Sequence, residues 1–297
     1  ATKINYKKIS LSANHTKMTM RTKPSWLKVK LPIGKSYVAV KEIVSSHKLH
    51  TICQSGSCPN IGECWGNGTA TFMILGNICT RSCKFCAVQT GKPDIVDVEE
   101  PMNVAKSIQL MKLKHCVVTS VDRDDLPDGG AEIWAQTVRA IKQLNPQTTI
   151  ETLIPDFQGN KKLLNKIIEV KPDVVSHNLE TGIRTTKLLR NQAIYERSLE
   201  VLRYLKENGI ITKSGIMVGV GETDDEIYQV MDDLLKVKCD IMTIGQYLQP
   251  TKEHLPVERY VTPEQFDQYK KVGLEKGFKF FESAPLVRSS YHAEKHI

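Results

Sequence analysis

The sequence predicts an α/β fold, specifically a partial (β/α)6 TIM-like barrel, on three observations. From residue 71 onward, short apolar runs alternate with segments whose apolar residues recur every three or four positions. The apolar runs are nearly continuous, as in parallel strands that helices cover. Polar or Gly-rich groups follow five of the six runs; the third, 151–157, lacks a comparable group. In βα barrels the active site forms at this end of the strands.

The predicted strands and helices alternate along the chain. The expected strands are 72–75, 116–121, 148–154, 174–177, 213–220 and 241–248, with a last strand at 278–281 after the final helix. The expected helices are 102–113, 131–144, 160–170, 195–208, 224–236 and 263–276, preceded by a weaker helical pattern at 38–48. Six units fall short of the eight of a closed barrel, so an open side could admit a bulky substrate.

Composition and charge are those of a globular protein. The chain has 297 residues, 25% of them charged, and a net charge of +8. No apolar run approaches the roughly 20 residues that span a bilayer, and the N-terminus lacks the apolar segment of a secretory signal. We therefore expect no membrane association and a location in the cytoplasm or an organelle matrix, and no motif indicates a nucleic-acid partner. Residues 1–20 are Lys-rich and aperiodic, which predicts a mobile segment or a transit-peptide remnant.

A loop with three cysteines follows the first predicted strand. Cys79, Cys83 and Cys86 have the spacing C-x-x-x-C-x-x-C, with Phe85 before the last cysteine. Three thiolates on one loop can hold one soft metal centre. Iron–sulfur cubes normally take four cysteines, so a cube here would keep one iron open for a small ligand. A zinc knuckle is the alternative interpretation of such spacing.

A second cysteine triplet lies upstream of the first strand. Cys53, Cys58 and Cys64 are spaced C-x-x-x-x-C-x-x-x-x-x-C within a stretch rich in Gly and Pro. That composition predicts a winding loop that could wrap a cluster. Clustering of six of the eight cysteines into two triplets favours metal sites in a reducing compartment over disulfides. The other two, Cys116 and Cys239, lie in apolar strands and are predicted to be structural.

The first triplet resembles that of the radical S-adenosylmethionine (SAM) superfamily. The resemblance implies a 4Fe–4S cluster whose open iron chelates SAM and which, when reduced, cleaves SAM to a 5′-deoxyadenosyl radical. It also implies candidate SAM contacts after the later strands. These are Asp128, Gly129 and Gly130 for the amino group, Asn178 and Glu180 for the ribose, Arg190 for the carboxylate, and Lys213 on the fifth strand.

For several of these residues a purely structural role is the alternative interpretation. Asp128-Gly129-Gly130 could be only a helix-capping turn, and Arg190 only a solvated charge at a helix end. His177 is predicted to be a satisfied core histidine rather than a functional one.

Seven segments together resemble the lipoyl synthase family, from about Pro24 to the C-terminus. They are CQSGSCPNIGECW, CTRSCKFCAV, TSVDRDDLPDGGA, VVSHNLET, TKSGIMVGVGET, GQYLQPT and RSSYHAEK. The resemblance implies insertion of two sulfur atoms at C6 and C8 of an octanoyl chain on a carrier lysine. Cys79, Cys83 and Cys86 would hold the SAM cluster, and Cys53, Cys58 and Cys64 an auxiliary 4Fe–4S cluster that supplies the sulfur. Ser290 would be its fourth ligand, with Ser289 as the alternative.

The same resemblance implies partners and a division of the chain. The carriers would be octanoylated lipoyl domains of 2-oxoacid dehydrogenase E2 subunits and the glycine-cleavage H protein. A ferredoxin or flavodoxin would donate electrons, and an iron–sulfur carrier would rebuild the consumed cluster. Residues 1–70 would form an N-terminal extension with the auxiliary-cluster motif, 71–277 the barrel, and 278–297 a tail closing over that cluster. The Lys-rich N-terminus could dock an acidic carrier domain; the alternative is a solubilising tail.

Competing functions come from two classes. Another two-cluster radical SAM enzyme, such as a methylthiotransferase or a dehydrogenase, would add no pair of sulfurs to an octanoyl carrier. A non-enzymatic iron–sulfur scaffold or electron carrier would not cleave SAM and would not need polar groups around a barrel rim.

Overall fold

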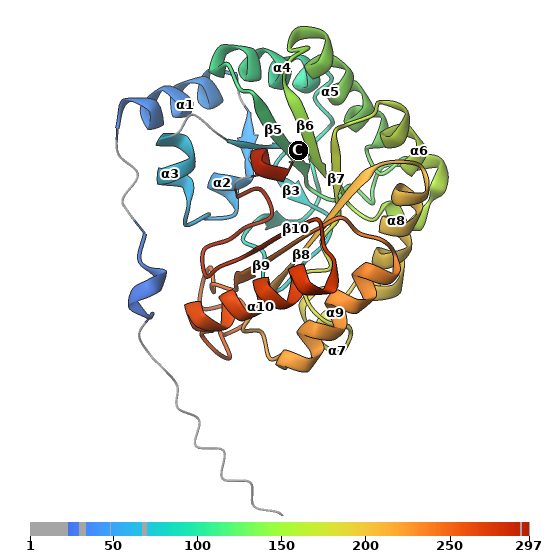
Figure 1. Ribbon diagram of the computed structural model, residues 1–297. Helices are drawn as coiled ribbons and strands as arrows, with labels where there is room; N and C mark the ends of the chain where they lie inside the picture. Colours follow the sequence, from blue (N-terminus) through green and yellow to red (C-terminus); the bar gives the residue numbers. More distant parts are fainter. Residues whose placement is uncertain (1–22, 30–33, 48, 67–69, 292, 297) are drawn as a thin grey trace, which may run out of the picture.

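The computed structural model describes residues 23–29, 34–47, 49–66, 70–291 and 293–296. An eight-stranded sheet forms its centre, and helices cover the outside of that sheet (Figure 1). The sheet strands are β1 His50–Thr51, β2 Thr71–Ile74, β5 His115–Ser120, β6 Thr149–Leu153, β7 Val174–Ser176, β8 Ile211–Val218, β9 Ile241–Gln246 and β10 Phe280–Ser283. A separate short pair consists of β3 Ile78–Cys79 and β4 Gln89–Thr90.

Ten α-helices and three short 3-10 helices lie within the described residues. The α-helices are α1 Lys35–Ser46, α2 Ile52–Ser55, α3 Ile61–Gly66, α4 Glu100–Met111, α5 Ala131–Leu144, α6 Lys161–Glu169, α7 Ile183–Leu189, α8 Tyr195–Glu207, α9 Asp224–Lys236 and α10 Pro263–Lys276. The 3-10 helices are η1 Ser25–Leu27, η2 Phe157–Gly159 and η3 Ala293–His296.

The sheet is an open barrel, which confirms the predicted fold class. Its strand order is β1-β2-β5-β6-β7-β8-β9-β10, and the neighbours from β2 to β10 all pair in parallel. β1 pairs antiparallel with β2, so β1 and β10 are the two edges. The last strand, predicted at 278–281, begins two residues later and extends the sheet beyond the six predicted units.

Three helices, α5, α9 and α10, were predicted to the residue at both ends, and local sequence signals explain the agreement for α9 and α10. Helix α9 begins at a capping box in which the Thr223 hydroxyl accepts from the Glu226 N–H and the Glu226 carboxylate accepts from the Thr223 N–H. Helix α10 ends at Gly277, whose φ of 110° is left-handed backbone that favours glycine. Each apolar face packs on the sheet, where burying one large side chain stabilises the fold by roughly 1.5–3 kcal/mol.

The second cysteine triplet is more regular than predicted. Instead of one winding loop, α2 and α3 form around it. The Thr51 hydroxyl accepts from the Gln54 N–H and caps α2, and Gly56 ends it after one turn. Trp65 on α3 is fully buried, and its ring lies 5.3 Å from that of Tyr37 on α1. The prediction of a loop was wrong because local capping and this aromatic contact outweigh the Gly and Pro content.

The C-terminal tail after β10 crosses the open side of the barrel. The Asn60 side chain donates to the Leu286 carbonyl at 2.7 Å, and the Tyr291 hydroxyl donates to Glu63 at 3.0 Å. The tail therefore connects the β10 edge to the α2–α3 segment beside the β1 edge. Because β1 and β10 belong to the sheet, the sheet itself extends across both predicted boundaries, 70/71 and 277/278.

Some expectations concern residues outside the described part of the chain. The predicted mobile segment at 1–20, the Lys-rich docking segment and His292 of the RSSYHAEK motif all lie there. Among the helices that the structure describes, none has the length and apolar composition that crossing a bilayer requires.

Candidate active site

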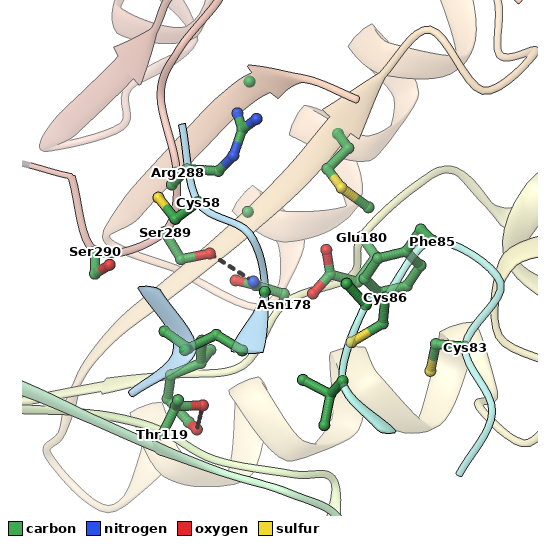
Figure 2. Close-up of a pocket in the computed structure, with 18 of the residues that line it drawn as sticks. Cys58, Cys83, Phe85, Cys86, Thr119, Asn178, Glu180, Arg288, Ser289 and Ser290 are labelled. Carbon is green, nitrogen blue, oxygen red and sulfur yellow. Dashed lines mark hydrogen bonds between the residues drawn. The ribbon is translucent and has the colours of Figure 1, made fainter. Parts of the chain in front are cut away.

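A single cavity of about 600 Å³ brings together most of the residues that the sequence singled out. Its wall includes Cys53 and Cys58 from the second triplet, all three cysteines of the first, and both Ser289 and Ser290 from the tail. In Figure 2, Cys58 and Arg288 lie on one side of the view, and Cys83, Cys86 and Glu180 lie on the other. Thiols of both cysteine triplets thus face the same cavity.

The first triplet follows β2 and is held by contacts from several elements. The Cys79 sulfur accepts hydrogen bonds from the N–H groups of Arg81 and Asp122, at 3.4 and 3.3 Å. His254 Nε2 donates to the Cys86 carbonyl at 3.0 Å. Burial raises the pKa of the Cys83 thiol to about 12 and that of Cys86 to about 11. Thiols in such an apolar setting ionise only with a compensating cation, as iron would provide.

Arg81, inside the first cysteine motif, fixes this loop to the strand ends. Its guanidinium donates to Asp124 at 2.6 Å and to Asp156 at 2.9 Å, and lies 3.4 Å from Asp122. Burial raises the pKa of Asp122. Burial also acts to raise the pKa of Asp156, but the charge of Arg81, a contribution of His177 and the hydrogen bonds that the carboxylate accepts together lower it. Asp156 follows the third predicted strand, so the expectation that this strand end contributes no strongly polar group was wrong.

The second triplet lies on the opposite part of the wall. Burial raises the pKa of both Cys53 and Cys58, and the Arg288 charge acts in the opposite direction on Cys58. Cys64 is not part of the cavity wall, but it lies close enough to Tyr291 to influence the pKa of the Tyr291 hydroxyl. Tyr291 follows Ser290 directly, so the tail carries the serine hydroxyl to the same region as the triplet.

The two tail serines have different partners. The Asn178 amide donates to the Ser289 hydroxyl at 2.6 Å, as Figure 2 shows. The Thr71 hydroxyl donates to the Ser290 hydroxyl at 2.9 Å. Thr71 also hydrogen-bonds to Cys53, so Ser290 is the serine that lies beside the second triplet.

The donors of the first triplet suit an iron–sulfur cube. Within the described residues, no three His, Cys, Asp or Glu side chains gather closely enough for one metal ion. Zinc requires four ligands at about 2.0–2.3 Å from a single point. The three thiols of the first triplet all line the cavity and suit a larger soft centre, and none of the eight cysteines forms a disulfide.

Three of the predicted SAM contacts lie on the cavity wall. Asn178, Glu180 and Arg190 all line it. Asn178 Oδ1 and Arg190 Nε are buried without a hydrogen-bond partner, which is costly unless a ligand satisfies them. Burial raises the pKa of Glu180, with Arg190 acting against it. A ligand with hydroxyl, amino and carboxylate groups, such as SAM, matches this set.

The other four predicted SAM contacts do not line the cavity. The Asp128 carboxylate accepts from the N–H groups of Gly130 and Glu132, both at 2.9 Å, and caps α5. Gly130 packs closely on Leu75, where an added Cβ would lie 2.5 Å away. Lys213 donates to Glu151 at 2.9 Å inside the barrel, and both side chains are almost fully buried. The geometry favours a helix-capping turn for Asp128, Gly129 and Gly130, and a structural role for Lys213.

Replacement of Lys213 by methionine should destabilise the fold rather than weaken SAM binding. The change leaves Glu151 buried with only the Ser176 hydroxyl, which donates to it at 2.7 Å. Removing one partner of a buried ion pair costs about 3–5 kcal/mol. Denaturant unfolding measures this loss, and the double variant with Glu151→Leu should recover much of it. Unchanged stability together with weaker SAM binding would favour the original prediction instead.

His177, Cys116 and Cys239 behave as structural residues. Both His177 ring nitrogens are hydrogen-bonded, to the Ile154 carbonyl and the Ser198 hydroxyl, each at 3.0 Å. Burial, with a smaller effect of Arg190, lowers the pKa of His177 to about 4. Cys116, in β5, and Cys239 are 1% and 3% exposed in the core. Cys239 was expected inside a strand, but it lies in the connection between α9 and β9.

Sequence reasoning missed three residues that shape the site: Arg81, Asp122 and Thr71. Arg81 and Asp122 lie inside motifs that were recognised, CTRSCKFCAV and TSVDRDDLPDGGA. In the second motif the residue that lines the cavity is Asp122, and the predicted contacts Asp128, Gly129 and Gly130, further along the chain, do not line it. Thr71 begins the first barrel strand, and no local signal marks it.

Comparisons with known proteins agree with this geometry. Residues 73–234 match the model of the radical SAM superfamily, and residues 2–58 match the N-terminal domain of lipoyl synthase of the radical SAM family. The chain is 65% identical to the mitochondrial lipoyl synthase of Nematostella vectensis, over 93% of this chain and 95% of that protein. It is 63% identical to the lipoyl synthase of Flavobacterium johnsoniae, over 93% and 96%.

A solved structure is similar in fold. Streptococcus suis SuiB bound to S-adenosylmethionine superposes with a TM-score of 0.56 at 12% identity, over 75% of this chain and 54% of SuiB. At that identity the similarity concerns the fold alone.

Proposed function

The chain belongs to the lipoyl synthase family of the radical SAM superfamily, and from this premise we propose how its residues divide the reaction. The protein is a SAM-dependent sulfurtransferase with two 4Fe–4S clusters, and it inserts two sulfur atoms at C6 and C8 of protein-bound octanoyl-lysine. Cys79, Cys83 and Cys86 hold the cluster that binds SAM. Cys53, Cys58, Cys64 and Ser290 hold the auxiliary cluster.

The observation that carries this proposal is the shared cavity between the two cysteine groups. Unactivated methyl and methylene carbons have no acidic proton, so acid–base catalysis cannot activate them. The SAM cluster supplies the radical that removes hydrogen, and the auxiliary cluster supplies the sulfur. The protein's task is to hold the octanoyl chain between them and to exclude water, which gives a large gain from proximity.

The cavity wall suggests a role for each of the remaining polar residues. Arg190 is suited to the SAM carboxylate because a guanidinium can donate two parallel hydrogen bonds to it. Glu180 and Asn178 Oδ1 are suited to hydroxyl and amino donors. Arg81 acts through the loop that it ties to Asp124 and Asp156, and so positions the first triplet.

We also propose that the three parts of the chain have separate tasks. Residues 1–70 and 278–297 serve the auxiliary cluster, since they contribute its cysteines and serine. Residues 71–277 serve SAM. The tail contacts at Asn60, Glu63 and Thr71 support this pairing of the two extensions.

The protein acts on lipoyl carrier proteins and needs an electron donor. We propose as carriers the lipoyl domains of 2-oxoacid dehydrogenases and the glycine-cleavage H protein. A ferredoxin or flavodoxin is the proposed donor, and an iron–sulfur carrier rebuilds the auxiliary cluster. Related lipoyl synthases include mitochondrial and bacterial proteins, and we propose the cytoplasm or, in a eukaryote, an organelle matrix as the location.

The test of the function is a mass measurement. Anaerobically reconstituted protein is mixed with an octanoylated carrier domain, SAM and a reductant. The carrier should gain two sulfur atoms, and it should lose two hydrogens as well once the two thiols have closed to the cyclic disulfide. Cleavage of SAM without any sulfur addition would contradict the proposal and would favour a dehydrogenase or another two-cluster enzyme.

Replacement of Ser290 by cysteine should leave the auxiliary cluster in place but impair turnover. A serine ligand would let one iron leave the auxiliary cluster as the cluster gives up its sulfur. Thiolates bind iron more firmly than hydroxyls do, so a cysteine at this position would retain that iron. Iron content should stay at the level of the unchanged protein while lipoyl formation falls. Normal turnover in this variant would count against a labile serine ligand.

Removal of residues 1–20 tests whether the Lys-rich segment docks the carrier. If it does, the truncated protein should bind an acidic carrier domain more weakly, and its binding should depend less on salt. Measuring the affinity at low and at high ionic strength gives both the strength of carrier binding and its dependence on salt. Equal affinities for the two proteins at both salt concentrations would leave the segment with only a solubilising role.

A further inference from the structure

The two serine hydroxyls of the tail are held by residues on different sides of the barrel. Asn178, which follows β7, holds Ser289 at 2.6 Å, whereas Thr71, the first residue of β2, holds Ser290 at 2.9 Å. Thr71 and Ser290 are 219 residues apart in the sequence. The tail is therefore fixed at two neighbouring positions, by a residue after β7 and by the first residue of β2.

Thr71 occupies a rigid and buried position. It pairs with Val117 of β5 in the sheet and is 6% exposed. It lines the cavity, and both its backbone and its side chain hydrogen-bond to Cys53. One hydroxyl thus contacts a thiol of the second triplet and the candidate serine ligand at the same time. A hydroxyl has one proton, and Thr71 donates it to Ser290, so the same hydroxyl has no second proton to donate to a Cys53 thiolate.

We propose that Thr71 is a positioning residue that holds the Ser290 hydroxyl whenever that serine is released from the auxiliary cluster. The inference rests on the proposed role of Ser290 as the fourth ligand. A released hydroxyl on this wall needs a hydrogen-bond partner, and the Thr71 hydroxyl donates to it from a strand that cannot move away. Thr71 therefore favours the released form, and it makes the serine-bound iron easier to lose.

The consequence is measurable without turnover. The net contribution of one such hydrogen bond corresponds to about fivefold in an equilibrium between two forms. Replacing Thr71 by valine keeps the shape of the side chain and its preference for a strand, but removes the donor. Serine should then stay on the iron for longer.

The experiment uses the full chain, reconstituted anaerobically, with no SAM and no substrate. An iron chelator is added, and the loss of the first iron is followed by absorbance and by Mössbauer spectroscopy of the auxiliary cluster. Thr71→Val should lose this iron about fivefold more slowly than the unchanged protein. Thr71→Ser retains the donor and should restore the original rate.

A matched control is available in the same cavity. Thr119 is also 6% exposed and lies on the cavity wall, but its hydroxyl donates to the Leu153 carbonyl at 3.1 Å instead of to a serine. Figure 2 shows Thr119 below Ser290, on the same side of the view. Thr119→Val should lose iron at the rate of the unchanged protein.

The outcomes separate this inference from the ligand assignment. Ser290→Ala should lose the same iron at once or fail to take it up; wild-type behaviour of that variant would overturn the assignment of Ser290 itself. If Ser290→Ala behaves as expected but Thr71→Val loses iron at an unchanged or faster rate, the role of Thr71 is wrong. Failure of both Thr71→Val and Thr71→Ala to hold the auxiliary cluster would likewise overturn it, since Thr71 would then stabilise the bound form.

Discussion

Replacement of Cys58 by alanine is expected to abolish formation of the lipoyl product while leaving reductive cleavage of SAM intact. Cys58 lies on the cavity wall opposite the first triplet and beside Arg288 (Figure 2). Its loss removes one of the three proposed thiolate ligands of the auxiliary cluster, and thiolates dominate the stability of such clusters. Iron and sulfide should fall to about half of the unchanged values, and the octanoyl chain should gain no sulfur.

Cys116 offers a control for that experiment. It is a free cysteine, 1% exposed in β5, and it does not line the cavity. Cys116→Ala should lower stability by creating a small void in the core but retain all the iron and the product. Cys83→Ala should lose both the cleavage of SAM and the formation of the lipoyl product. Sulfur insertion by Cys58→Ala at the normal rate would contradict the role of the second triplet.

Replacement of Gly245 by alanine is expected to displace the C-terminal tail and release the auxiliary cluster. Gly245 lies on β9, where an added Cβ would stand 2.0 Å from the Val287 carbonyl oxygen and 3.2 Å from Arg288 Nη1. Neither the strand nor the tail backbone can yield without breaking the bond between the Gln246 N–H and the Pro285 carbonyl. Such overpacking costs about 1–3 kcal/mol, and moving the tail moves Ser289 and Ser290 away from the wall.

The measurement for Gly245→Ala is the iron content together with SAM cleavage. Iron should decrease towards the amount that one cluster holds, and lipoyl formation should be lost, while SAM cleavage remains. Gly182→Ala is the matched control, because the nearest heavy atom to its added Cβ lies at an ordinary 3.7 Å. Full iron content and normal product in Gly245→Ala would show that the tail does not have to pack on β9.

The features that sequence alone predicted are those with a local signal. Alternating apolar runs predicted the barrel. The predicted boundaries of α9 and α10 agree to the residue, and in the structure Thr223 and Thr262 cap these two helices. The cysteine spacings indicated two metal sites because ligands of one centre are often close in sequence.

What the sequence did not predict depends on contacts between distant segments. Arg81 meets Asp156 across 75 residues, and Thr71 meets Ser290 across 219. From the sequence, Lys213 is a charged residue on a strand and was predicted to contact SAM. Only the fold shows that Glu151 neutralises its charge inside the barrel. Asp128 looked like a ligand contact because Gly-rich turns serve both purposes; the direction of its carboxylate, towards the N-terminus of α5, favours the capping role.

The central claim is that two iron–sulfur clusters face one cavity, one to start the reaction on SAM and one to give up its sulfur. Iron and acid-labile sulfide per chain, measured after anaerobic reconstitution and removal of excess metal, test it most directly. Two cubes predict about eight of each. A value near four for both, in protein that still forms the lipoyl product, would contradict the account.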